Sequence, residues 1–170
     1  MAAQIRERMD AGRVREGCMN TLGVTQDREK IAARLGLVRT DNQRRWGKMT
    51  AHQMVCHLGD SFRSVIGEKA LAAKPGTLGQ GFMKVVALHM PFRWPHGVKT
   101  MPEVDQEIGG TRPAEFDADV RELRRLLERF TREPRDFSWR PHPIFGVMTD
   151  KDWMRWGYLH MDHHFRQFGV

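Results

Sequence analysis

The sequence predicts an all-α protein, a four-helix bundle, and three observations support this fold class. Apolar residues recur at the three- and four-residue spacing of amphipathic helices in several separate segments. Two of these segments are preceded by a Thr with Gln or Asp three residues later, the pattern of an N-terminal capping box. No pair of segments has the alternation typical of paired strands. Helices broken by Pro and Gly clusters therefore account for the whole pattern.

The first two core helices are expected before residue 67. One should run from about Asp27 to Val38, with Ile31, Leu35 and Val38 on its apolar face. The second should begin after Thr50, whose side chain and that of Gln53 fit a capping box, and should continue to about residue 66.

A long connection follows, from residue 67 to 111, with a short helix candidate at 82–89. Connections within a bundle are short when they join antiparallel neighbours. This one therefore predicts a long crossover between the second and third core helices.

The last two core helices carry the clearest signals. Pro113 is predicted to occupy the first turn of the third helix, where a missing N–H is tolerated. Its apolar face consists of residues at helical spacing: Phe116, Val120, Leu123, Leu127 and Phe130. FSWRPHPIFGVM is expected to be a loop, and Thr149 with Asp152 should cap a terminal helix from about Asp150 to Phe168.

Length and composition predict a single domain. A chain of 170 residues, 40% of them hydrophobic, can bury one substantial core. Residues 25–170 are assigned to the helical domain and residues 1–24 to an N-terminal extension, loose and without a clear pattern. Cys18 and Cys56 suggest no disulfide framework or zinc ribbon, which fits a reducing cytoplasm. No segment has the apolar length of a signal peptide or a membrane-spanning helix, so no membrane partner is expected.

The positive charge of the chain does not by itself indicate a nucleic-acid partner. The formal charge is +7, and residues 1–48 contribute +5 of it, from eleven Lys or Arg against six Asp or Glu. A nucleic-acid surface would combine such charges with aromatic side chains. Trp46 is the only aromatic residue in that stretch, so a solvated basic surface is the preferred interpretation.

Three histidines near the end of the chain separate on a helical wheel. With about 100° per residue, His160 and His164 fall within the apolar arc, whereas His163 lies at its polar boundary. The i, i+4 spacing brings two imidazoles close enough to share a metal ion. Two core histidines hydrogen-bonded to neighbouring groups are the alternative. Asp162 and His163 could form a proton relay, although a solvated helix face explains them as well.

His57 occupies the centre of a small, polar stripe beside the apolar face of the second helix. The stripe consists of Gln53, His57, Ser61, Ser64 and Glu68 and is typical of a pocket wall. A third imidazole here would complete an open three-nitrogen site, the pattern of catalytic metal centres. A surface histidine is the alternative.

The helical wheel also gives the directions of the residues near His57 on the same helix. His52 should face solvent, and Cys56 lies about 100° away from His57. Asp60, Glu68 and Gln53 are candidates to orient a metal-bound imidazole. No catalytic residue can be assigned.

Three stretches resemble a known family: RWGKMTAHQMVCHLGD (45–60), HPIFGVMT (142–149) and WMRWGYLHMDHHFRQFGV (153–170). Together they are similar to a domain-of-unknown-function branch of the DinB/YfiT-like metalloenzyme superfamily, over about residues 27–170. The resemblance implies a DinB-like four-helix bundle with a long crossover and a metal site formed by His57, His160 and His164.

The resemblance also implies a metal-dependent enzyme. Other branches transfer or isomerise low-molecular-weight thiols, so a divalent metal, Zn or Ni with these ligands, would activate a thiol or water for transfer, isomerisation or hydrolysis. Trp94, Trp153, Trp156 and the loops 92–96 and 141–147 would line the pocket, or else only pack the bundle. The alternative is a non-catalytic metal-binding bundle of stress-response type, dimeric through one face.

Overall fold

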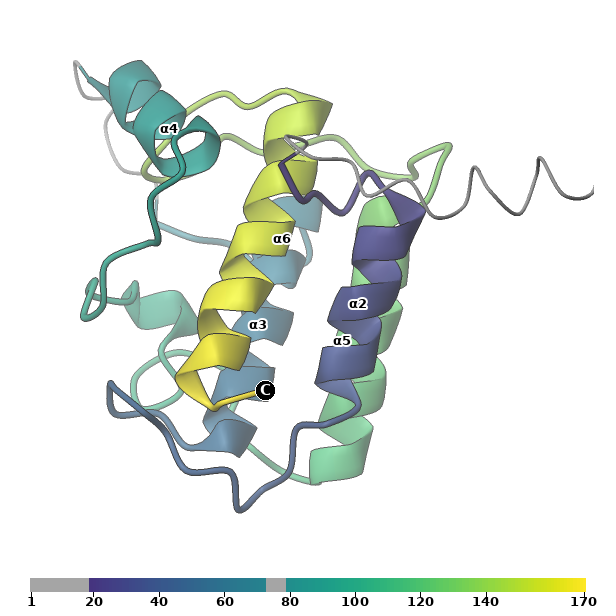
Figure 1. The fold of residues 1–170 in the computed structure, drawn as a ribbon, viewed down its shortest axis with the longest axis vertical. Coiled ribbons are helices and arrows are strands. Elements are labelled where there is room, and N and C mark those ends of the chain that lie inside the picture. Colours follow the sequence, from purple (N-terminus) through teal and green to yellow (C-terminus); the bar gives the residue numbers. More distant parts are fainter. Residues whose placement is uncertain (1–18, 73–78) are drawn as a thin grey trace, which may run out of the picture.

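The computed structural model describes residues 19–72 and 79–170, and over these ranges the chain is all-helical. Five α-helices and one 3₁₀ turn are present there, and no strand (Figure 1). In chain order they are α2 (Thr25–Leu35), α3 (Ala51–Ile66), α4 (Gln80–His89), the 3₁₀ turn η1 (Pro102–Val104), α5 (Phe116–Thr131) and α6 (Asp150–Gln167). The predicted all-α class is confirmed. Most of the predicted N-terminal extension, residues 1–18, lies outside the described residues.

The first helix starts and ends earlier than predicted. α2 ends at Leu35 and Gly36 caps it, so Val38 lies beyond the helix. Val38 is nevertheless buried in the core, because the chain turns back over the end of α2. Leu22, assigned by sequence to the extension, is also fully buried, and its N–H donates to the carbonyl of Met154.

Both predicted capping boxes are confirmed. Thr50 accepts a hydrogen bond from the Gln53 N–H and donates its own N–H to the Gln53 side chain, at the start of α3. Thr149 and Asp152 do the same at the start of α6. α3 ends at Gly67, whose φ of 88° is in the left-handed region that favours glycine.

The start of α5 differs from the prediction. Its N-cap is Glu115, whose carboxylate accepts hydrogen bonds from the N–H groups of Asp117 and Ala118. Pro113 therefore precedes the helix instead of occupying its first turn. The predicted apolar face is correct for Leu123, Leu127 and Phe130, which are buried, whereas Phe116 and Val120 are only half-buried.

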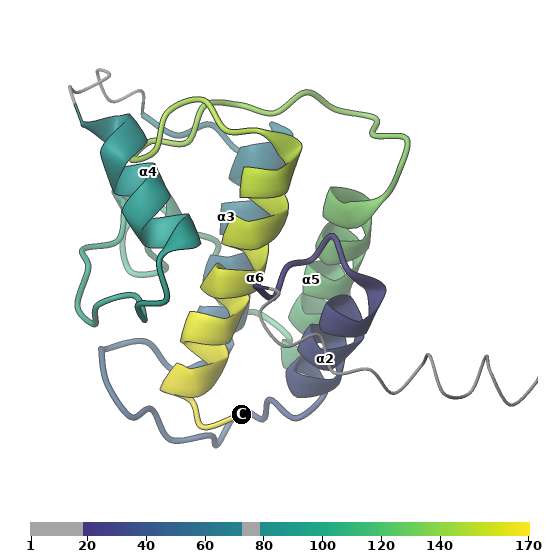
Figure 2. The same cartoon turned by 45° about the horizontal axis from the view of Figure 1, so that its top comes forward.

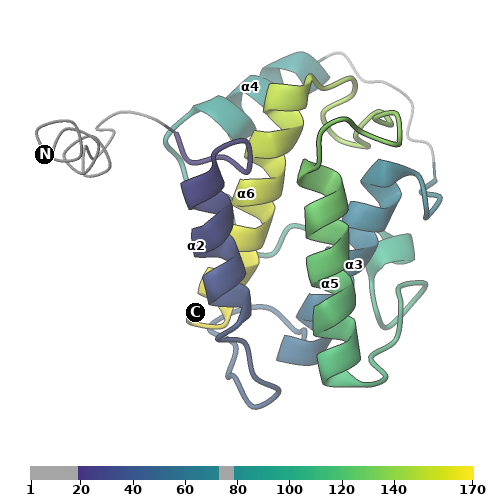
Figure 3. The ribbon, with the colours of Figure 1, turned by 90° about the vertical axis from the view of Figure 1, so that its right-hand side faces the viewer.

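The helices form two pairs (Figures 2 and 3). α3 packs along α5 and α2 along α6. Arg63 of α3 contacts Glu122 of α5, and Glu68 just after α3 contacts Arg129 further along α5, so these two helices run in the same direction. The predicted crossover therefore connects two parallel neighbours, which explains its length.

α4 belongs to the crossover and lies outside the two helix pairs, beside α6 (Figure 2). It contacts α6, and Leu88 is its only buried residue. None of the described helices has the length and apolar character required to cross a bilayer. The core lies between α2, α3, α5 and α6, and its largest fully buried side chains include Phe62, Phe130, Trp153 and Phe165.

Candidate metal centre

Three histidines from two helices converge beside the core. His57 comes from the middle of α3, and His160 and His164 come from successive turns of α6. One ring nitrogen of each lies within 4.8 Å of the other two. The ring centroid of His57 lies 5.3 Å from that of His160 and 4.8 Å from that of His164. The three residues selected by helical periodicity are thus brought together in space.

A backbone carbonyl fixes the tautomer of His57. The Nδ1–H of His57 donates to the carbonyl oxygen of Val104, in η1, at 2.8 Å. Because a carbonyl can only accept, the proton is on Nδ1 and the lone pair on Nε2. That Nε2 atom faces Nε2 of His160 at 3.3 Å.

Gln167 fixes the tautomer of His164 in the same way. The side-chain amide N–H of Gln167 donates to the carbonyl of Trp46 at 2.8 Å, so its Oε1 atom is directed to Nδ1 of His164, 2.9 Å away. Nδ1 must then donate, and Nε2 keeps its lone pair. Gly47 permits this approach: its φ is 78°, and a Cβ there would lie 2.6 Å from Nε2 of Gln167.

His160 is held by rings instead of a second hydrogen bond. Its ring centroid lies 4.9 Å from that of Trp156 and 6.0 Å from that of Trp94. Its Nδ1 atom is buried and has no hydrogen-bond partner within the described parts of the chain. Buried ring nitrogens normally have hydrogen-bond partners. The polar contact of the His160 ring is therefore made through its Nε2 atom.

Burial keeps the three imidazoles neutral. It lowers the pKa of His57, which the Val104 carbonyl partly offsets. Burial also lowers the pKa values of His160 and His164 well below the ordinary value, and the other imidazoles add to this effect. Neutral imidazole is the form that binds metal ions.

The separation between the His57 and His160 nitrogens matches that of two ligands of a tetrahedral metal ion. Ligand bonds of about 2.0–2.1 Å at tetrahedral angles separate two nitrogens by about 3.3 Å. The His57 and His160 Nε2 atoms are 3.3 Å apart. His57 and His164 each keep a lone pair on Nε2, and one ring nitrogen of each of the three imidazoles lies within 4.8 Å of the others. A single cation could bind all three nitrogens, whereas one proton can be shared by only two.

A second cluster lies on the opposite side of α3, and the sequence analysis missed it. His52, predicted to face solvent, is half-buried, and its Nε2–H donates to Oδ2 of Asp119 on α5 at 2.7 Å. The Cys56 thiol also donates to Oδ2 of Asp119, at 3.5 Å. Burial, followed by the Asp119 carboxylate, raises the pKa of Cys56 to about 12. These groups bind one another through protons.

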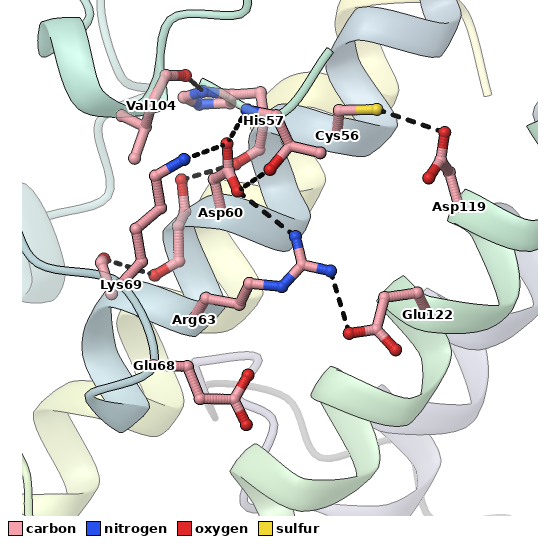
Figure 4. Close-up of polar contacts among 12 residues, drawn as sticks. Cys56, His57, Asp60, Arg63, Glu68, Lys69, Val104, Asp119 and Glu122 are labelled. Atoms are coloured by element: carbon pink, nitrogen blue, oxygen red, sulfur yellow. Dashed lines mark hydrogen bonds and ion pairs between the residues drawn. The ribbon is translucent and has the colours of Figure 1, made fainter. Parts of the chain in front are cut away.

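The three residues expected to orient the metal ligands do not contact the imidazoles. Gln53 caps α3, and Glu68 forms ion pairs with Arg125 and Arg129 on α5. Asp60 is fully buried, but it accepts hydrogen bonds from Thr111, Lys69, Arg63 and Gln106 (Figure 4). Val104 and Gln167 perform the orienting role instead.

The serines of the predicted polar stripe on α3 form hydrogen bonds within the helix. The Ser61 hydroxyl donates to the carbonyl of His57, and the Ser64 hydroxyl donates to the carbonyl of Ser61, so both are satisfied within their own helix. Figure 4 shows His57 directed to Val104 and Cys56 directed to Asp119. Within the described structure, His57 is the member of the stripe that belongs to the three-histidine group.

Aromatic side chains surround the imidazoles on the side of the 92–96 loop. Trp46 stacks on His96 with ring centroids 3.9 Å apart, and Trp94 lies 6.2 Å from His163. Burial lowers the pKa of His163 to about 4. Its neighbour Asp162 accepts hydrogen bonds from Arg34 and Arg166, so within the described structure no hydrogen bond joins the predicted relay pair.

The tryptophans of α6 have different roles. Trp156 contacts His160, whereas Trp153 is buried in the core and stacks on Trp139. In the 141–147 loop, His142 packs against Trp156, and burial lowers its pKa to about 4. Trp94 and Trp156 therefore border the centre, and Trp153 packs the interior.

One protein family matches this chain. Its sequence model, described as protein of unknown function (DUF1569), covers residues 72–169, more than half of the 170 residues. The chain belongs to the DUF1569 family. The matched region contains α4, α5 and α6, and with them His160 and His164, while His57 precedes it. Comparisons with curated proteins and with solved structures found no match.

Proposed function

We propose that this DUF1569 protein is a metal-dependent enzyme of the DinB-like type, in which His57, His160 and His164 bind one divalent metal ion. The observation that carries the proposal is the convergence of three ring nitrogens within 4.8 Å, two of them with tautomers fixed by Val104 and Gln167. All three ligands are imidazoles, which suits Zn or Ni. The helical domain that forms the site is residues 25–170.

Three protein ligands would leave at least one coordination position for another molecule, the arrangement of catalytic metal sites. A thiol or water bound there would have a lowered pKa and would be held as a nucleophilic anion. A low-molecular-weight thiol is the proposed cosubstrate. The chain's own contribution is to keep three imidazoles neutral, to orient two of them, and to border the site with Trp94 and Trp156.

The first experiment measures metal content of the purified, tag-free protein by elemental mass spectrometry. The wild type should hold close to one divalent ion per chain after reconstitution, and the His57→Ala, His160→Ala and His164→Ala variants should each lose it. His52→Ala is the matched control, because it removes an imidazole from the same helix outside the centre. A wild type that binds no metal, or ligand variants that retain it, would exclude the site.

A second experiment tests the thiol. Co(II) would replace the native metal, and glutathione, bacillithiol and mycothiol would be added in turn while the visible spectrum is recorded. A spectral shift with one of them supports a metal-bound thiolate. Silence with all three removes the thiol from the proposal and leaves activated water as the nucleophile.

A further inference from the structure

The crossover carries an apolar surface that the described structure leaves uncovered. On α4, Phe82 and Val86 and, at its end, Met90 follow one another at four-residue spacing, so they form a single stripe. The exposed fractions are 75% for Phe82, 37% for Val86 and 40% for Met90. Met83 and Val85 flank the stripe and are also exposed, and Phe92 extends it past the helix end at 65%.

The opposite side of α4 fixes this orientation. Leu88 is fully buried, and its carbonyl accepts a hydrogen bond from Arg155 of α6. Lys84, on the same side as Leu88, contacts the carboxylate of Asp152, also on α6, and His89 contacts it from the last position of the helix. The helix is therefore held to α6, beside which it lies in Figure 1, and the side chains of the apolar stripe remain exposed.

The charged residues in the sequence around this stripe have one sign. Residues 69–102 contain five Lys or Arg and no Asp or Glu. Lys69 and Lys84 are paired with Asp60 and Asp152. Arg93 and Lys99 are exposed, and neither has an ion pair within the described structure. Two cations thus lie close in sequence to the stripe, with no acid nearby in the chain.

We propose that the α4 face, defined as Phe82, Met83, Val85, Val86, Met90 and Phe92 with the cations Arg93 and Lys99, docks on an anionic phospholipid surface. Large exposed apolar patches on proteins mark interaction sites. A helix with an apolar face and adjacent Lys or Arg lies in the interfacial plane of a bilayer. Burial of its apolar side chains and attraction of its cations to anionic lipids both contribute to binding there. A second copy of the chain would bring like charges together, whereas anionic headgroups complement them.

This docking is peripheral and departs from the sequence-based expectation, which excluded a membrane partner because no segment can span a bilayer. It is also independent of the metal centre. A lipid surface near α4 would lie beside the 92–96 loop. Trp94 of this loop borders His160.

The test is co-sedimentation of the full chain with vesicles. Vesicles of equal parts phosphatidylglycerol and phosphatidylcholine should bind the wild type more tightly than pure phosphatidylcholine, and high salt should weaken the binding. The double variant Phe82→Gln/Val86→Gln should bind at least about tenfold less, since it removes apolar contact with the bilayer. Leu37→Gln/Ile108→Gln is the matched control: both residues are exposed, at 59% and 67%, and lie elsewhere.

The charge contribution is tested separately. Arg93→Gln/Lys99→Gln should weaken vesicle binding by about fivefold per basic residue. Arg112→Gln/Arg121→Gln makes the same change in net charge at exposed positions before and on α5 and should have little effect. Equal binding to neutral and anionic vesicles, or no binding, overturns the proposal. So does a dimer, measured by light scattering, that Phe82→Gln/Val86→Gln dissolves, because the stripe would then face a second copy.

Vesicle binding by the His57→Ala variant keeps the two proposals distinguishable. That variant should lose metal and still bind vesicles. Loss of both together would tie the α4 face to the metal centre and overturn the independent docking proposed here.

Discussion

α3 contributes to two clusters of possible metal ligands on opposite sides, and they differ in what holds them together. On the α6 side, His57 meets two imidazoles, and the Val104 carbonyl outside the cluster accepts the hydrogen bond from its Nδ1–H. On the α5 side, His52 and the Cys56 thiol donate to one carboxylate, Asp119. The first cluster therefore keeps ring nitrogens with lone pairs, whereas the members of the second cluster form hydrogen bonds with one another.

The atom separations express this difference. Nε2 of His52 lies 2.7 Å from Oδ2 of Asp119, the length of a charge-assisted hydrogen bond. Nε2 of His57 lies 3.3 Å from Nε2 of His160, close to the edge of a tetrahedral coordination sphere. In both groups the possible ligand atoms lie within 4.8 Å of one another, yet the two groups differ chemically. Proximity alone therefore does not make a metal site, because the ligand atoms must also be free of protons.

Chelation should give the largest contrast between the two sides. A metal held at a free concentration about 100 times its dissociation constant stabilises the fold by about 2.7 kcal/mol. For a chain of this size, EDTA should then lower the melting temperature by about 5–10 °C. Wild type and His52→Ala should both respond, and His57→Ala should not. Calorimetry with and without EDTA provides the measurement, and a response by His57→Ala would contradict the assignment.

Gln167→Leu should weaken metal binding while leaving all three ligands present. It removes the acceptor that holds His164 in its Nδ1–H tautomer, and loss of such an orienting group costs about 10–100-fold in metal affinity. Competition with a coloured chelator measures the dissociation constant. Gln43→Leu, at an exposed position, is the control. An unchanged dissociation constant for Gln167→Leu would show that packing alone orients His164.

Asp119→Asn should affect only the α5 side. The pKa of Cys56 is raised to about 12 by burial and then by the Asp119 carboxylate, so thiolate forms only at high pH. Removing the negative charge lowers that pKa, and alkylation below it speeds up about tenfold for each unit of decrease. Iodoacetamide labelling of the Cys56 peptide from pH 8 to 10, followed by mass spectrometry, measures the rate. Metal content should not change, and a loss of metal would mean that the two clusters are coupled.

His52→Ala should have the smallest effect. It removes the hydrogen bond to Asp119 and the edge contact with Phe116, a change of about 1 kcal/mol in the free energy of unfolding. Urea denaturation of His52→Ala, Asp119→Asn and the double variant completes a cycle. Strictly additive effects would indicate that the contact contributes nothing to stability.

Much of the fold could be predicted because its signals are local. The two capping boxes and the apolar spacing of α5 depend on residues within one or two turns, and the structure contains them. The end of α2 was misplaced because Val38 is apolar and buried although it is not helical. Pro113 was misplaced because a proline just before a helix and one in its first turn have the same local sequence.

The surroundings of the candidate site were harder to predict. Gln167 had a usable signal, its position three residues after His164 on the same helix. The carbonyls of Val104 and Trp46 had none, because every residue has a carbonyl and only the crossover and the 45–47 turn bring these two into place. Asp60 was a reasonable candidate as an acid one turn from His57, but Thr111 and Lys69, distant in sequence, occupy its oxygens.

The sequence by itself determined which residues share a helical face, and so selected His57, His160 and His164, because helical geometry follows from local backbone preferences. Only the tertiary structure decided that α3 and α6 bring these imidazoles together and that His52 meets an acid. It also decided which ring nitrogens keep lone pairs. Those outcomes depend on donors and acceptors from distant segments, and hydrogen bonds between such segments exist only once the chain has packed.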